Sequence, residues 1–308
     1  MTVLRPRALR PGDRLGIAAP AGPVDATRLE RGVAELRSLG FDVLVPEGAL
    51  ARRGFTAGPR ERRLRELTAL LADDAVAGIV CARGGAGAGG LLDGLDEALV
   101  RGHPKLLVGY SDITFLHLYL ARLGIASVHG PMVAWELAEG RYDRDSFRHA
   151  LLGEGAPYAT EADDLEPLRP GRAEGVLRGG CLSILAAAAG TPWALDTAGE
   201  DTILFLEDVD ERPYRIDRMI RQLRASGALA GVRGVVFGEM RGCAPRLGED
   251  YRLEDVLLEA LDGLEVPVAL GLSSGHANSP AVALPLGVAA LLDCGDGARF
   301  EVREPGVA

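Results

Sequence analysis

A serine placed between an apolar run and an amphipathic run is the most chemically suggestive feature of this 308-residue chain. Residues 105–108 predict a short buried strand, Ser111 follows it, and the leucine-rich residues 114–123 predict a helix. A serine at such a corner points away from the sheet, and the free N–H groups of the helix N-terminus favour developing negative charge. Ser111 is therefore a candidate nucleophile. The alternative is that Ser111 or Asp112 only caps the helix.

Three more segments follow predicted strands at their carboxyl ends, where open α/β sheets build their sites. The first is residues 82–87, Ala-Arg-Gly-Gly-Ala-Gly. Glycines there let backbone N–H groups approach a tetrahedral oxyanion or a phosphate closely. An oxyanion is favoured over a phosphate because residues 82–87 by themselves match neither glycine-rich phosphate motif, GxGxxG nor GxxxxGK[ST]. The alternative is a turn that binds nothing.

The other two segments carry an acid and an imidazole. Glu207 begins an acidic cluster, residues 207–211, directly after an apolar strand. A carboxylate at a strand end can orient an imidazole, although an acidic cluster alone is more typical of a solvated loop. His276 lies just past a predicted strand in the second half of the chain. His129 follows the strand next to that of Ser111 and is a rival base, and spacing alone does not choose between the two.

Composition excludes several classes of function. The chain is 47% hydrophobic and 25% charged, as expected of a globular protein. A formal net charge of −10 argues against binding nucleic acid, which needs clustered lysine and arginine. We expect a cytoplasmic protein without a membrane segment, because no run approaches the roughly 18 apolar residues of a span and no signal peptide is apparent. The four cysteines show no CxxC spacing, so neither zinc nor disulfides are indicated.

Regular alternation of short apolar and longer amphipathic runs in the first half predicts a mostly parallel sheet with helices on both faces. Between about residues 152 and 173 the pattern gives way to glycine, proline and acidic residues, which are typical of a linker. Strands and helices then resume, and residues 289–302 predict a hairpin. We therefore expect a nucleophile-bearing α/β domain over 1–152, a linker over 153–173 and a second domain over 174–308.

These residues together resemble the LD-carboxypeptidase family of serine peptidases, which includes muropeptide LD-carboxypeptidases and microcin C immunity peptidases. The similarity runs nearly from end to end. Its motifs lie at residues 10–13, 18–22, 82–85, 109–112, 129–132, 206–208, 214–218, 275–276 and 284–287. Each motif alone is weak, but their order and spacing together are specific.

The resemblance implies a catalytic triad of Ser111, Glu207 and His276, with the backbone N–H groups of Asp112, Gly85 and Gly84 as oxyanion donors. It also implies a flavodoxin-like, doubly wound parallel-sheet N-terminal domain and a smaller β-rich α/β C-terminal domain, with the active site in the cleft between them. No cofactor or metal is implied. The substrate implied is a small muropeptide that loses its C-terminal D-amino acid in peptidoglycan recycling, and the implied assembly is a homodimer.

Two positions depart from the family pattern. Ala86 replaces the usual tyrosine of the glycine motif, and Cys181 replaces an asparagine in Gly-Gly-Asn-Leu. Both changes bear on specificity. Arg83 is a candidate for binding the substrate carboxylate. Alternative functions are hydrolysis of peptidyl-nucleotide amides, with Trp135 or Trp193 stacking on a base rather than packing, and non-catalytic binding of a small anion.

Overall fold

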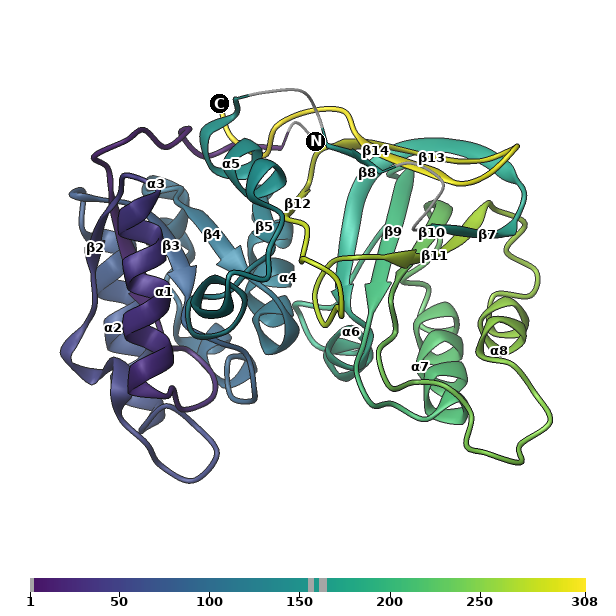
Figure 1. Ribbon diagram of the computed structural model, residues 1–308, viewed down its shortest axis with the longest axis horizontal. Helices are drawn as coiled ribbons and strands as arrows, with labels where there is room; N and C mark the ends of the chain where they lie inside the picture. The colour runs from purple at the N-terminus through teal and green to yellow at the C-terminus, as the bar shows by residue number, and fades with distance from the viewer. Residues whose placement is uncertain (1–2, 155–157, 161–164) are drawn as a thin grey trace. The chain divides into compact units, whose positions relative to one another are not determined.

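The computed structural model describes residues 3–154, 158–160 and 165–308, which form two compact units (Figure 1). The first unit comprises Met1–Ala156, Pro280–Gly287 and Pro305–Ala308, and the second comprises Pro157–Ser279 and Val288–Glu304. Each unit is therefore built from separate stretches of sequence, because the chain returns twice to the first unit.

The first unit is built on a sheet of six strands among its described residues, in the order β12-β5-β4-β3-β1-β2. The strands are β1 (Arg14–Ala18), β2 (Asp42–Leu44), β3 (Val76–Cys81), β4 (Leu106–Gly109), β5 (Ser127–His129) and β12 (Leu284–Leu286). All neighbours pair in parallel except β12, which is antiparallel to β5. The helices are α1 (Ala26–Ser38), α2 (Arg60–Ala72), α3 (Glu97–Gly102), α4 (Thr114–Arg122) and α5 (Arg144–Leu152). The strand order 2-1-3-4-5 is that of a flavodoxin-like, doubly wound domain.

Local sequence explains why these elements form. Strands β3 and β4 are continuous apolar runs with almost every residue buried, as parallel strands covered on both faces require. Helix α1 begins after Asp25, whose carboxylate accepts a hydrogen bond from the Arg28 N–H at 2.9 Å. Its buried residues Leu29, Val33 and Leu36 repeat at helical spacing and face the core.

The second unit is built on a sheet of eight strands among its described residues, in the order β6-β14-β13-β8-β9-β10-β11-β7. The strands are β6 (Ala159–Thr160), β7 (Glu166–Arg169), β8 (Gly171–Cys181), β9 (Thr202–Glu207), β10 (Val232–Gly238), β11 (Val268–Leu272), β13 (Ala289–Cys294) and β14 (Arg299–Val302). The run β8 to β11 is parallel, and the flanking strands are antiparallel. Helices α6 (Leu182–Ala188), α7 (Pro213–Ala225) and α8 (Leu253–Ala260) lie side by side (Figure 1).

The expected fold class, a doubly wound parallel-sheet domain followed by a smaller β-rich α/β domain, is confirmed. The structure differs from expectation over residues 153–173, which were predicted to link the domains. Residues 155–157 and the acidic run 161–164 of that range lie outside the described residues. The remainder supplies β6, β7 and the start of β8. An edge strand tolerates Pro167, because one side of its backbone needs no partner.

Within the described part of the chain, each helix is too short or too polar to cross a bilayer.

Candidate active site

Ser111 stands at the turn between β4 and α4, in a single 3₁₀ turn of residues 111–113. Its φ is 64°, a left-handed conformation that costs a non-glycine residue about 1–2 kcal/mol. Neither Ser111 nor Asp112 caps this turn or α4 with its side chain, so the helix-cap alternative is not supported. Strain of this kind is typical of a nucleophile held on a sharp strand-to-helix turn.

The glycine loop, residues 84–88, packs directly against that serine. A Cβ added to Gly84 would lie 2.7 Å from Cβ and 2.9 Å from Oγ of Ser111, so only glycine fits there. The Gly84 carbonyl accepts a hydrogen bond from the Gly22 N–H at 3.0 Å, which holds the loop from behind. The N–H groups of Gly84 and Gly85 donate to no acceptor among residues 3–154, 158–160 and 165–308. Both donors thus remain available to a ligand, and Gly84 lies beside the Ser111 hydroxyl.

The side chain of Asp112 is occupied in holding this loop. Asp112 is 3% exposed, and its carboxylate accepts a hydrogen bond from the Ala88 N–H at 2.7 Å. Burial raises the pKa of Asp112, while the Ala88 hydrogen bond and the positive charge of Arg63 oppose that rise. The residue after the serine therefore ties the serine turn to the glycine loop.

Glu207 and His276 form a hydrogen-bonded pair in the second unit. Glu207 ends β9, is 1% exposed, and accepts two hydrogen bonds on Oε2: from Nδ1 of His276 at 2.7 Å and from its backbone N–H at 3.0 Å. The His276 side chain is 16% exposed, so its ring reaches the surface. Because an ionised carboxylate only accepts, Nδ1 carries the proton and Nε2 keeps its lone pair. This is the tautomer that a general base needs.

Gly275 makes the close approach of this pair possible. Its φ is +78°, and a Cβ added there would lie 2.6 Å from the Glu207 carboxylate. We expect Gly275→Ala to lower kcat by about 100-fold, because a displaced imidazole is a misaligned base. Gly199→Ala is the matched control, since Gly199 has a φ of +77° and no atom within 4 Å of an added Cβ. Steady-state kinetics of both variants decide the point: equal activities would exclude the steric explanation.

Two other histidines, His129 and His117, are buried in the first unit. His129 is 0% exposed in β5, where its strand pairs with Gly109 and Leu284, so its ring is closed off from solvent. Burial lowers the pKa of His117 to about 3, and its ring nitrogens contact the Ser127 hydroxyl and the Gly109 carbonyl, each at 2.8 Å. Of the two rivals that the sequence leaves open, His276 is hydrogen-bonded to the Glu207 carboxylate and has a partly exposed side chain, whereas His129 is fully buried.

The comparisons with known proteins cover both units. Residues 15–130 match the model of the LD-carboxypeptidase N-terminal domain, and residues 174–292 match that of the C-terminal domain. The chain belongs to the LD-carboxypeptidase family. It is 36% identical to the "Probable murein peptide carboxypeptidase" of Bacillus subtilis, over 99% of this chain and 95% of that protein. The expectation of a serine-type carboxypeptidase is thereby confirmed.

Two solved structures extend the comparison. The muramoyltetrapeptide carboxypeptidase of Oxalobacter formigenes superposes with a TM-score of 0.83 at 30% identity, covering 95% of this chain and 99% of that one. MccF in complex with glutamyl sulfamoyl guanosine superposes with a TM-score of 0.86 at 24% identity, covering 99% of this chain and 100% of that one. At that identity MccF establishes the shared fold.

The two departures from the family pattern lie in different surroundings in this LD-carboxypeptidase. Ala86 is exposed in the glycine loop. Cys181 is buried at the end of β8, pairs in register with Glu207, and has its Sγ 3.3 Å from the Ser183 hydroxyl. Burial raises the pKa of the Cys181 thiol, and the neighbouring acidic residues Glu207 and Asp208 raise it further. The thiol is therefore a neutral side chain beside the Glu207 position.

Arg83 follows β3 and is half-buried. Its guanidinium donates to the carbonyls of Gly84 at 3.2 Å and Pro23 at 3.1 Å, and it forms no ion pair with a described carboxylate. Its positive charge thus remains available to an anion. Trp135 packs instead, since the Arg28 guanidinium lies 4.3 Å from its ring centroid and covers that face. Trp193 is half-buried.

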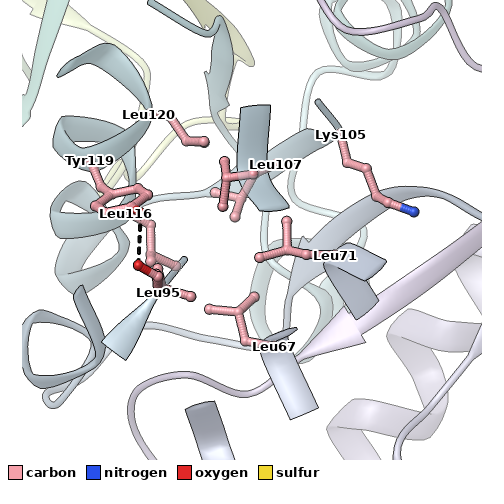
Figure 2. Close-up of a pocket in the computed structure, with 9 residues that line it drawn as sticks. Leu67, Leu71, Leu95, Lys105, Leu107, Leu116, Tyr119 and Leu120 are labelled. Atoms are coloured by element: carbon pink, nitrogen blue, oxygen red, sulfur yellow. Dashed lines mark hydrogen bonds between the residues drawn. The ribbon is translucent and has the colours of Figure 1, made fainter. Parts of the chain in front are cut away.

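A separate hollow in the first unit is lined mainly by leucines (Figure 2). The lining residues are Leu67, Leu71, Leu95, Val100, Lys105, Leu107, Leu116, Tyr119 and Leu120. Its polar groups are bonded within the protein: the Tyr119 hydroxyl donates to the Leu95 carbonyl, and the Lys105 ammonium donates to the carbonyls of Asp73 and Val76. These polar groups are therefore not available to form hydrogen bonds with a peptide substrate.

Two residues that support the glycine loop were given no role from the sequence: Gly22, which was noted only as part of a family motif, and Arg63. Gly22 lies in the Ala-Pro-Ala-Gly motif after β1, and its position after a strand was the signal that could have found it. Arg63 lies in α2 among several other arginines, and periodicity gave no sign that it is buried.

Proposed function

We propose that this chain hydrolyses the amide between an L-centre and the C-terminal D-amino acid of a murein tetrapeptide, with Ser111, His276 and Glu207 as the catalytic triad. The observation that carries the chemistry is the strained Ser111 packed against a glycine loop whose Gly84 and Gly85 N–H groups have no acceptor in the described part of the chain. The substrate is inferred from relatives named for murein peptides, which align with this chain nearly end to end.

In this mechanism the Ser111 hydroxyl attacks the carbonyl carbon, and Nε2 of His276 takes its proton. The N–H groups of Asp112, Gly85 and Gly84 stabilise the resulting oxyanion, and one such donor is typically worth roughly 3 kcal/mol. His276 then gives the proton to the leaving amine, so that the D-amino acid departs and an acyl-serine remains. Water, deprotonated by His276, attacks this ester and releases the shortened peptide and the free serine.

Arg83 is proposed to bind the carboxylate of the D-residue. Its side chain follows the same strand as the glycine loop, and no described carboxylate neutralises its charge. An exopeptidase must recognise the free C-terminus, and a guanidinium is suited to that task because it binds a carboxylate through two parallel hydrogen bonds.

The alternative functions have less support. The microcin C7 self-immunity protein MccF of Escherichia coli is 26% identical to this chain over 92% of it, whereas relatives named for murein peptides share 30–36% identity with this chain. Trp135, a candidate for stacking on a nucleobase, already has Arg28 over its ring. A non-catalytic anion-binding role does not explain the hydrogen-bonded Glu207–His276 pair.

The proposal is tested by mass spectrometry of purified wild type and Ser111→Ala, each incubated with a murein tetrapeptide ending in D-alanine or with an aminoacyl-sulfamoyl adenosine. Loss of one D-alanine by wild type alone is the expected result. Serine-dependent cleavage of only the adenosine compound would assign the chain to the microcin immunity branch. No cleavage of either would favour anion binding.

A homodimer acting in the cytoplasm, as part of peptidoglycan recycling, completes the proposal. These parts rest on the family resemblance. Light scattering on the purified protein at two concentrations, and fractionation of cells of the source organism, test them directly.

A further inference from the structure

We propose that Arg63, together with the Asp112 carboxylate, positions the glycine loop of residues 84–88 against Ser111, and that Arg63 thereby controls the turnover rate without touching the substrate. Only the catalytic consequence rests on the proposed function. The positioning itself is a property of the first unit and can be measured without any substrate.

Arg63 connects three segments of the chain: the residues after β1, the residues before α2, and the glycine loop. Its side chain leaves α2 and is 6% exposed. Nη1 donates to the Gly87 carbonyl at 2.8 Å and also to the Pro20 carbonyl after β1, and Nε donates to the Gly58 carbonyl at 3.2 Å. Burying a guanidinium is costly unless its N–H groups are bonded, so this charge is tied to these carbonyls. Burial lowers the pKa of Arg63, and attraction to Asp112 opposes that change.

The glycine loop is held at two adjacent residues. Arg63 binds the carbonyl of Gly87, and Asp112 binds the N–H of Ala88 at 2.7 Å. Asp112 is also the neighbour of Ser111 and supplies one of the proposed oxyanion donors from its own backbone. Its side chain therefore holds the loop that bears the other two proposed donors, Gly84 and Gly85. The Asp112 side chain, together with Arg63, thus links the proposed donor on the serine turn to the two proposed donors on the glycine loop.

Gly87 shows how closely the guanidinium approaches the loop. Its φ is +119°, and an added Cβ would lie 3.0 Å from Nη1 of Arg63 and 2.9 Å from Cγ2 of Thr56. Any side chain at Gly87 would displace the guanidinium. Because Arg63 is buried and its donors face backbone carbonyls, it acts through the loop as a positioning residue. A loop shift of about 1 Å is enough to cost on the order of 100-fold in rate.

The test is Arg63→Met in the full chain, with Arg65→Met as the matched control because Arg65 is an exposed arginine of the same helix. We expect Arg63→Met to lower kcat by about 100-fold with KM within about threefold, since donors are misplaced while substrate contacts remain. Hydrogen exchange by mass spectrometry should show faster exchange of residues 84–88 in Arg63→Met. Arg63→Lys, which can reach only some of the carbonyls, should recover part of both properties.

Each outcome bears on the proposal. A folded Arg63→Met with wild-type exchange in residues 84–88 would overturn the positioning role, and faster exchange with unchanged kcat would overturn its catalytic consequence. If Arg63→Met does not fold, Arg63→Lys decides, and wild-type values of both kcat and exchange would overturn the inference. Failure of wild type and Arg65→Met to cleave any tetrapeptide would reject the proposed function, while the exchange measurement would still test the loop.

Discussion

Ser111→Ala is expected to reduce kcat for the murein tetrapeptide by about 10⁶-fold, the scale seen when a serine nucleophile is removed from a triad. Without the hydroxyl no acyl-enzyme forms, and the oxyanion donors and bound substrate can assist only the slow attack of water. Alanine loses one atom at a half-buried position and takes up the same φ of 64°, so the fold should persist. The dissociation constant of the tetrapeptide, measured by calorimetry, should stay within about threefold of wild type, because substrate contacts other than the bond-forming one remain.

Ser38→Ala is a suitable control for that experiment. Ser38 is an exposed serine at the end of α1, and among the described residues its hydroxyl donates to Glu35 alone, at its main-chain and side-chain oxygens. It should retain wild-type kinetics. If Ser111→Ala turned over within tenfold of wild type, Ser111 would not be the nucleophile, and the strain at its φ would need another explanation.

The fold was largely predictable because its elements have strong local signals. Strands β3 and β4 are short apolar runs, and α1 has both a capping aspartate and helical spacing of its apolar residues. Strand β12 was not predictable in the same way. It joins the first unit although it lies more than 150 residues from β5 in the sequence, and its pairing with β5 depends on where the chain returns. Local pattern does not encode such a return.

The candidate site was predictable in part. The sequence placed Ser111 at a strand end and identified His276 and His129 as rival bases. The two histidines differ in how deeply they are buried, and burial depends on packing that one sequence does not reveal. His129 lies within β5, where every residue is buried, whereas His276 follows a strand and is partly exposed. Arg63 shows the same limit, because α2 carries several arginines and only the structure shows which one turns inward.

Glu207→Gln is expected to lower kcat by roughly 10⁴-fold, the scale found when a triad carboxylate becomes an amide. Glu207 is buried and glutamine has nearly the same volume, so the unit should fold. The carboxylate oxygen Oε2 accepts hydrogen bonds from both Nδ1 and the backbone N–H of His276. An amide lacks the negative charge that stabilises the imidazolium. It can also turn its NH₂ group toward Nδ1, which moves the imidazole proton to Nε2 and leaves the ring unable to accept the serine proton.

The dependence of rate on pH separates this role from simple damage to the structure. Removing a negative charge beside the imidazole disfavours its protonated form, so the acid limb of kcat/KM should move to lower pH in Glu207→Gln. Glu211→Gln is the matched control from the same acidic cluster, because Glu211 pairs only with Arg215 on the surface among the described residues. It should keep both the rate and the profile of wild type. A Glu207→Gln enzyme with a reduced rate but an unmoved acid limb would show that Glu207 supports the loop without acting on the base. Equal losses of kcat/KM in Glu207→Gln and Glu211→Gln would show that the acidic cluster acts through its total charge. The orientation of His276 would then depend on its own backbone and on Gly275.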